Sequence, residues 1–450
     1  MIGWRHPAFP AILLATLVLA PFLNKAFTLD DPVFLLEAAH VAKDPLHPAS
    51  VEVVWTNNRR GELAHPFVPD ARIAGYLLLP VMIMNWQEWF AHLLVLAYFL
   101  VTILGTTTLA KRLGLGLWGQ HAAATLVASA PVMLGMAGTV FPDIPAAMFA
   151  VWGVERLYSY RADGTHGACW AASLLLALAC LSRIHVLGLL GLAVLWALAS
   201  DRRLLIPLTT ALGIAVVGIV IMRDPGSAVA SLSGRGTWSP SSWRLTPNAI
   251  SFGIAALTTT PFFLLVFRRR RGWEPSGLLW LWLLLPIPIL TYVHYSAKYF
   301  VPVVPAMAIL VAAGLEPTSR RTSVLTLATT VGVFVGLLVL SADARMANAQ
   351  RWAAETLIRP RVASGERVWY AGHWGFHWYA ERSGAIPVTV EAPWPSPGEI
   401  LISSSADEPR MLCFLPRHLL QNVGDMRATG RVMSKGAQAG FYSNFFGTNS

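Results

Sequence analysis

Charged residues are scarce in this chain: Asp, Glu, Lys and Arg make up 13% of its 450 residues, about half the share in an average soluble domain. Hydrophobic residues make up 55%. A soluble globular protein of ordinary composition is therefore excluded. The composition indicates a multi-span membrane protein, whose helices satisfy their own backbone hydrogen bonds inside the lipid.

Cysteine is also scarce, with three residues in the whole chain. Cys169 and Cys180 fall on one predicted helix, about three turns apart, and Cys413 lies alone near the carboxyl end. These positions build no disulfide framework. The amino-terminal segment is basic and then apolar, like a secretion signal, but no A-x-A cleavage site follows it. We therefore expect an uncleaved membrane anchor.

Acidic residues are fewer than basic ones: 24 Asp and Glu stand against 34 Lys and Arg, a net charge of +10. A basic balance is typical of nucleic-acid-binding proteins. Here, however, the basic residues concentrate in short loops between apolar runs, which is the pattern that orients membrane proteins. We therefore predict membrane lipids, and no nucleic acid, as partners.

Apolar runs with basic residues between them predict about eleven membrane-spanning helices. The predicted spans are 8–23, 90–110, 119–138, 144–160, 168–182, 185–200, 204–222, 248–267, 276–292, 300–314 and 323–341. The stretch 72–86 has too few apolar residues to cross and is expected to lie on the membrane surface.

The basic residues then orient the chain, because short cytoplasmic loops collect Lys and Arg. With the amino terminus inside, every inner loop is basic, and the run "RRRR" at 268–271 faces the cytoplasm. An odd number of spans places the carboxyl-terminal tail outside. We expect a multi-pass protein of the plasma membrane, which is the inner membrane if the cell has two.

The tail from residue 342 has charges, prolines and short alternating runs. "RVWYAG" and "EILISSS" predict strands, and "AQRWAAETLI" and "GFHWYAERSG" predict helices. The predicted fold is thus a mainly α membrane protein. Residues 1–341 form a bundle of about eleven transmembrane helices, including a first exported loop at 24–89, and residues 342–450 form a small soluble α/β domain outside.

Two neighbouring carboxylates, Asp30 and Asp31, open the exported loop at the outer end of the first span. They precede "VFLLEAAHVA", which fits a short amphipathic helix on the membrane, with Pro32 in its first turn. One carboxylate is a good helix cap. A cap needs only one of the two, so the pair favours a function.

Several short motifs follow one another in a characteristic order. They are the acidic pair, "FLLEAAHVAKDP", "HPF", "AGYLLLP", "FPD" after the third span and "KYFVPVVPA" near the last spans. In this order and sidedness the chain resembles the GT-C glycosyltransferases, and among them bacterial enzymes related to lipid A aminoarabinose transferases and protein O-mannosyltransferases. The resemblance covers the whole membrane portion. It implies transfer of a sugar from a polyprenyl-phosphate carrier to a lipid, glycan or protein acceptor at the outer face, with inversion.

A phosphate leaving group departs without a proton, so such a transfer needs one carboxylate as general base on the acceptor hydroxyl. The first acidic residue of the family's motif is the usual candidate, which favours Asp30. Asp31 would then orient the acceptor or a cation.

Leaving phosphate also needs positive charge near it. Lys298 matches the place where the family usually has a basic residue before tyrosine, and Tyr299 supports the match; Lys in place of the common Arg loses the bidentate fork. Arg183 lies between two closely spaced spans. For both cations, contact with lipid headgroups is the alternative interpretation.

Three further residues follow from the resemblance. Asp143 in "VFPD" matches a second acidic residue of the family, although an ordinary helix start explains it equally well. Glu62 and His65 occupy the region near the donor phosphate, with His in place of Lys. A divalent metal on Glu62, His65 and a distant histidine is not supported by any tight ligand spacing, so a metal stays an open question and no other cofactor is predicted.

Other function classes remain open. A transporter or flippase usually places ionisable residues at the membrane midplane, whereas these acidic residues gather at one face. A non-catalytic scaffold predicts that Asp30 and Asp31 are dispensable. A GT-C polymerase or ligase is a neighbouring enzyme class, and neither the sugar nor the acceptor follows from the sequence.

Overall fold

Helices account for most of the residues that the computed structural model describes, which are 6–48, 50–51, 73–222, 245–268, 277–287, 296–372, 374–389, 391 and 393–403. The α-helices are α1 (Phe9–Leu19), α2 (Asp31–Val41), α3 (Ala74–Ile83), α4 (Glu88–Arg112), α5 (Leu117–Ser129), α6 (Pro131–Ala137), α7 (Asp143–Asp163), α8 (His166–Ser182), α9 (Leu187–Ser200), α10 (Leu205–Ile221), α12 (Leu245–Thr259), α13 (Gly277–Trp282), α14 (Val304–Leu315), α15 (Arg321–Ala353), α16 (Arg359–Ala363) and α17 (Trp374–Arg382). The strands are β1 (Val368–Ala371), β2 (Ile386–Pro387) and β3 (Ile400–Ser403).

Each predicted span overlaps a helix, but fewer helices are long enough to cross a membrane unaided. Within the described ranges, four helical stretches have the required length and apolar composition: Glu88–Arg112, Arg202–Ile221, Ala297–Leu315 and Arg321–Ala363. Shorter apolar helices occur at Phe9–Phe22, Ala74–Ile83, His166–Ser182 and Ile184–Ser200. The count of eleven spans and the orientation of the chain stay predictions.

Proline explains one break in the predicted spans. The span expected at 119–138 is divided into α5 and α6, because Ala130 precedes Pro131 and is extended, with ψ of 122°. The residue before a proline is disfavoured from helical geometry, and the ring removes a backbone donor. The span expected at 248–267 is likewise divided, with α12 ending at Thr259 just before Pro261.

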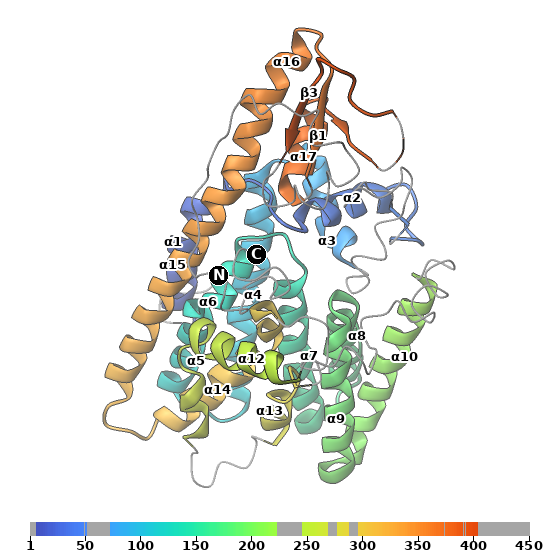
Figure 1. Ribbon diagram of the computed structural model, residues 1–450. Helices are drawn as coiled ribbons and strands as arrows, with labels where there is room; N and C mark the ends of the chain where they lie inside the picture. Colours follow the sequence, from blue (N-terminus) through green and yellow to red (C-terminus); the bar gives the residue numbers. More distant parts are fainter. Residues whose placement is uncertain are drawn as a thin grey trace.

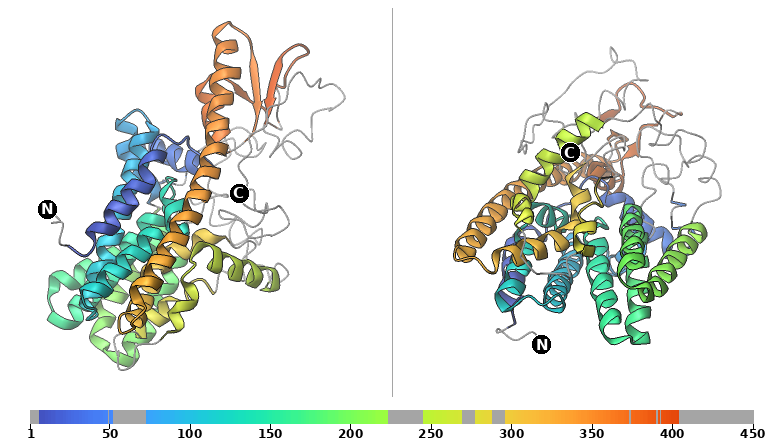
Figure 2. Two further views of the ribbon diagram at one scale, coloured as in Figure 1. Left: turned by 90° about the vertical axis from the view of Figure 1, so that its left-hand side faces the viewer. Right: turned by 90° about the horizontal axis from the view of Figure 1, so that it is seen from below.

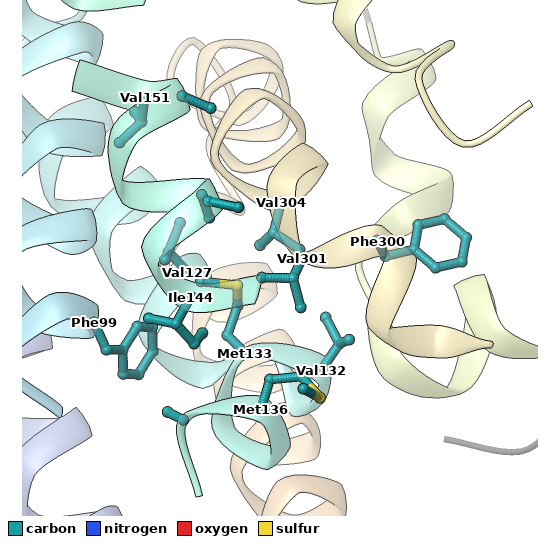
Figure 3. Packing of buried hydrophobic residues seen from close by; sticks show 14 of the residues in the cluster. Phe99, Val127, Val132, Met133, Met136, Ile144, Val151, Phe300, Val301 and Val304 are labelled. Atoms are coloured by element: carbon teal, nitrogen blue, oxygen red, sulfur yellow. The ribbon is translucent and has the colours of Figure 1, made fainter. Parts of the chain in front are cut away.

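The centre of the bundle is held by close helix contacts. Helix α7 packs between α4 and α8 (Figure 1). A Cβ on Gly153 of α7 would lie 2.7 Å from Leu176 of α8, so only glycine permits this approach. Figure 3 shows the apolar interior, where Phe99 of α4, Met133 of α6 and Ile144 of α7 are fully buried. This packing fixes the end of α7 that carries Asp143.

The segment predicted to be the first exported loop contains two short packed helices. Helix α2 begins at Asp31, with Pro32 in its first turn as expected. It is not the amphipathic surface helix that the sequence predicted, because most of its residues are buried and it packs against α3 and α17. Helix α3 has 10 residues, about 15 Å of rise, which is half of what a membrane crossing needs. The surface position predicted for 72–86 fits this length.

The carboxyl-terminal part rises from the bundle on one long helix. Helix α15 has 33 residues and runs past the expected domain boundary at 341 without a break (Figures 1 and 2). Beyond it, β1 and β3 form where strands were predicted, in a parallel sheet of order β2-β1-β3. Helix α17 connects β1 to β2, as parallel pairing requires a crossover. The described residues end at 403, so a separate α/β domain over 342–450 stays a prediction.

Candidate active site

The acidic pair lies where a sharp turn enters α2, with Asp30 before the helix and Asp31 as its first residue. Leu29 has a φ of 49°, in the left-handed region that residues with a side chain rarely adopt. The turn brings Asp31 back toward the preceding chain, where its Oδ2 accepts a hydrogen bond from the Thr28 N–H at 2.9 Å. Its Oδ1 accepts one from the Val140 N–H at 2.8 Å. Asp31 therefore ties the start of α2 to the segment before α7.

Asp30 differs from its neighbour in exposure. It occupies the N-cap position of α2, but its side chain makes no capping hydrogen bond, so the capping interpretation of the pair is wrong. The physical reason is that the N-cap backbone is helical here, with φ of −78° and ψ of 0°, whereas a capping side chain needs an extended residue. Asp31 is fully buried and Asp30 is partly exposed, so Asp30 presents the accessible carboxylate.

Burial and nearby charged or N–H groups act in opposite directions on the pKa of Asp31. Burial raises the pKa of Asp31 to about 7, while the Lys25 charge and the two N–H donors act in the opposite direction. Lys25 itself is buried and forms an ion pair with Asp343 of α15. This pair could not be predicted from local sequence patterns, because its members lie 318 positions apart.

Asp143 and Arg183 form the next part of the site. Asp143 is the first residue of α7 and is fully buried. Arg183 follows the last residue of α8 with an extended backbone, and its Nη2 lies 2.5 Å from Asp143 Oδ2. Helices α7 and α8 are antiparallel neighbours, so the start of one meets the end of the other. A buried ion pair of this kind costs desolvation, which makes a purely stabilising role a weak explanation.

Lys298 and Tyr299 complete the group from the 3-10 helix Ala297–Val303. The Lys298 ammonium lies 5.2 Å from the Phe141 ring centre and 5.9 Å from that of Tyr299, within the range of cation–π attraction. Phe141 directly follows Val140, the residue whose amide binds Asp31. The cation is therefore joined to the acidic turn through two neighbouring residues.

His185 was not singled out from the sequence. Its ring contacts Tyr299 edge to face at 5.4 Å between centres. Both of its ring nitrogens are buried and lack a hydrogen-bond partner among the described residues. Its place two residues after Arg183 was the available signal, since buried polar groups of this kind usually have a partner or a ligand.

The structure thus links Asp31 to Lys298 and Tyr299 through Val140 and Phe141, and it pairs Asp143 with Arg183. His185 joins the two groups by its contact with Tyr299, and Asp30 is the chain neighbour of Asp31. Glu62 and His65 lie outside the described residues. Among the described residues there is no group of three or more His, Cys, Asp or Glu side chains placed to hold a metal. The roles predicted for these residues are not tested by their positions alone.

No family model and no curated protein matches the sequence. Solved structures do match by shape. One is ArnT from Cupriavidus metallidurans bound to undecaprenyl phosphate, at a TM-score of 0.58 and 14% identity, covering 85% of each chain. Another is the oligosaccharyltransferase of Archaeoglobus fulgidus, at a TM-score of 0.52 and 13% identity, covering 86% of this chain and 65% of that one. The chain has the GT-C fold.

The GT-C fold confirms the resemblance that the sequence motifs indicated. At 14% identity the likeness establishes the fold and leaves the chemistry to the residues themselves. Chemically, the set offers a partly exposed carboxylate beside buried cations and aromatic rings. A carboxylate of this kind accepts a proton, and Lys, Arg and Tyr groups bind phosphate oxygens.

Proposed function

We propose that this chain is a glycosyltransferase that moves a sugar from a polyprenyl-phosphate carrier to a lipid, glycan or protein acceptor at the outer face of the membrane. One observation carries the proposal: an accessible carboxylate and two buried cations gather at one end of a GT-C bundle. The similar structures support the donor class, since ArnT is bound to undecaprenyl phosphate and an Archaeoglobus fulgidus relative to a dolichol-phosphate and an inhibitory peptide.

Asp30 acts as the general base in this proposal. As the acceptor oxygen bonds to the anomeric carbon, its proton passes to the Asp30 carboxylate. The bond from that carbon to the phosphate oxygen breaks, and the polyprenyl phosphate leaves with the electron pair. One direct displacement inverts the anomeric carbon. Asp30 suits the role because its side chain is partly exposed, whereas both Asp31 oxygens accept backbone hydrogen bonds.

Positive charge stabilises the departing phosphate. Lys298 is the first candidate, because it precedes a tyrosine as the family's basic residue does and lies over the Phe141 ring next to Val140. Tyr299 and His185 lie beside Lys298 and offer further hydrogen bonds to phosphate oxygens. Asp31 holds the turn, and Glu62 and His65 remain candidates for the donor side of the site.

The test compares lipid extracts and surface glycans of the native host by mass spectrometry. The host carries wild type, a deletion, Asp30→Asn or the matched control Asp44→Asn, whose side chain is 43% exposed beyond α2. Asp30→Asn should behave like the deletion, losing a defined sugar and accumulating its polyprenyl-phosphate precursor, because a general base contributes about 10²–10⁴-fold. Asp44→Asn should match wild type. An Asp30→Asn strain with normal glycans at matched expression contradicts the assignment.

A further inference from the structure

The linker before the acidic turn is held by distant parts of the chain. We define it as residues 24–28, of which 25–28 have no regular secondary structure. Backbone groups buried in such a segment need partners outside it. The Lys25 and Thr28 N–H groups bond to the nearby Phe22 carbonyl and Asp31 carboxylate. The backbone groups of Asn24, Ala26 and Phe27 instead have partners on α15 and α17.

Helix α15 holds the first half of the linker. Lys25 pairs with Asp343, and the Ala26 N–H donates to Asn348 Oδ1 at 3.0 Å. The Arg351 Nη2 donates to the Asn24 carbonyl at 3.2 Å. The three α15 partners lie on one side of the helix, at spacings of five and three residues. The long helix therefore meets the linker along about two turns of its surface.

Helix α17 holds the second half. The Phe27 N–H donates to the Tyr379 hydroxyl at 2.7 Å, and this hydroxyl donates to Glu88 Oε1 of α4 at 3.0 Å. The Phe27 ring also meets Trp378 edge to face at 5.9 Å. A Cβ on Gly375 would lie 2.2 Å from the Phe27 carbonyl oxygen, so α17 touches the linker backbone directly and only glycine fits there.

The next residue after this linker is Leu29, in its unfavourable left-handed conformation. Such a conformation persists only where the surroundings determine it on both sides. Asp31 fixes the far side through Thr28 and Val140. We propose that Tyr379 of α17 is a positioning residue: by fixing the Phe27 amide it holds the turn at Leu29 and so sets where the Asp30 carboxylate projects. The catalytic meaning of this clamp rests on the proposed function.

The first measurement is hydrogen exchange of the linker amides in purified protein. Tyr379→Phe removes one hydroxyl and should accelerate exchange in the peptide containing 24–31 by about tenfold, the value of one lost buried hydrogen bond. Tyr370→Phe is the matched control, because its hydroxyl donates to Glu381 at 2.9 Å in the same part of the chain, away from the linker. Equal linker exchange in the two variants overturns the clamp.

The second measurement separates positioning from general damage. Undecaprenyl phosphate, added as the probe, should shift the thermal midpoint of Tyr379→Phe as much as that of wild type. Sugar transfer in the host should fall about ten- to a hundredfold, since a small misplacement of a catalytic group has that effect. Normal transfer with a loosened linker overturns the positioning role.

A third variant reaches the same contact without touching a hydrogen bond. Gly375→Ala should reproduce both changes, because its methyl group meets the Phe27 backbone. Gly167→Ala, where a Cβ has nothing within 4 Å, is the control. If wild type transfers no sugar while Tyr379→Phe still loosens the linker, the proposed function fails and only the structural clamp survives.

Discussion

Helix α7 carries a fully buried carboxylate toward each end, and the two are treated differently. Near the carboxyl end, Glu155 meets two guanidinium groups, Arg112 at 3.2 Å and Arg156 at 2.5 Å. These arginine side chains are 31% and 34% exposed, so water also reaches the cluster. Arg112 also lies 3.6 Å from Asp163, and we call Glu155, Arg112, Arg156 and Asp163 the Glu155 cluster. Its charges satisfy one another and suit a structural role.

At the other end, Asp143 meets one guanidinium, and its Oδ1 has no hydrogen-bond partner among the described residues. We call Asp143, Arg183, His185 and Lys298 the Asp143 cluster. It contains more positive than negative groups and is lined by aromatic rings. Asp143 Oδ1 and both ring nitrogens of His185 lack a partner among the described residues, which favours a ligand or substrate group at this place. The comparison shows that burial alone does not separate a structural carboxylate from a functional one. The number of carboxylate oxygens that have a partner does.

Lys298→Ala should give the largest effect on transfer, a loss of about a hundredfold or more, because a cation aimed at the leaving phosphate contributes that much. Sugar transfer in the host, at matched expression, measures it. Lys111→Ala, an exposed lysine near the Glu155 cluster, should leave transfer unchanged. Equal losses in both variants would remove the distinction between the clusters.

Arg183→Met should lower the free energy of unfolding by about 3–5 kcal/mol, because it leaves the Asp143 charge buried without its counter-ion. The double variant Asp143→Leu/Arg183→Met should recover most of that stability, since a buried ion pair is replaced by apolar side chains. Thermal unfolding in detergent measures both. Transfer should stay low in the double variant, and its recovery would show that the pair is structural only.

Glu155→Gln should cost less, about 1 kcal/mol, because the two arginines it leaves behind are partly exposed and solvent screens their charges. Transfer per folded molecule should equal that of wild type. The same two measurements test it, and a transfer loss like that of Lys298→Ala would give the Glu155 cluster a function as well.

The smallest expected effect is on pH dependence. The folded pKa of Asp31, about 7, lies above the ordinary value of 3.8, so burial favours its protonated form. The contribution of Asp31 to the free energy of unfolding is therefore fully present below pH 3.8. It is lost as the pH rises through about 7. Lys25→Met/Asp343→Leu removes the stronger opposing charge together with its partner, which should raise the pKa further. Thermal midpoints should then continue to fall to a higher pH than in wild type, because the fall ends at the folded pKa.

The control for that measurement is Asp31→Asn, whose thermal midpoint should not change around pH 7. An unchanged pH profile in the Lys25→Met/Asp343→Leu variant would show that Lys25 has no influence on the acidic turn. The single variant Lys25→Met would leave the Asp343 charge buried without its partner, so the double variant gives the cleaner comparison.

The sequence predicted the fold best where signals are local. Apolar runs located the helices, the "VFPD" motif placed Asp143 at the start of α7, and alternating residues found β1 and β3. Pro131 was also visible, but a hydropathy window passes over a proline and joins α5 to α6. Local patterns therefore predicted where the helices and strands lie, but predicted one long helix where the structure has two shorter ones.

Long-range contacts account for what the sequence missed. The pairing of Lys25 with Asp343 and the contact of Phe27 with Tyr379 join segments more than 300 residues apart, and no local pattern encodes such partners. His185 was overlooked because a lone histidine after an arginine has no motif. Asp30 and Asp31 were predicted together, but only the three-dimensional turn shows that one is buried and the other accessible.

The position of α17 over the linker has a practical consequence for the size of the working unit. A chain ending after the membrane helices would keep Asp30, Asp143, Arg183 and Lys298, all of which belong to the candidate active site. It would lack the hydroxyl of Tyr379 and the close contact at Gly375. On the proposal made above, the shortest fully active enzyme therefore extends at least through Arg382, and the part beyond the membrane helices belongs to the catalyst.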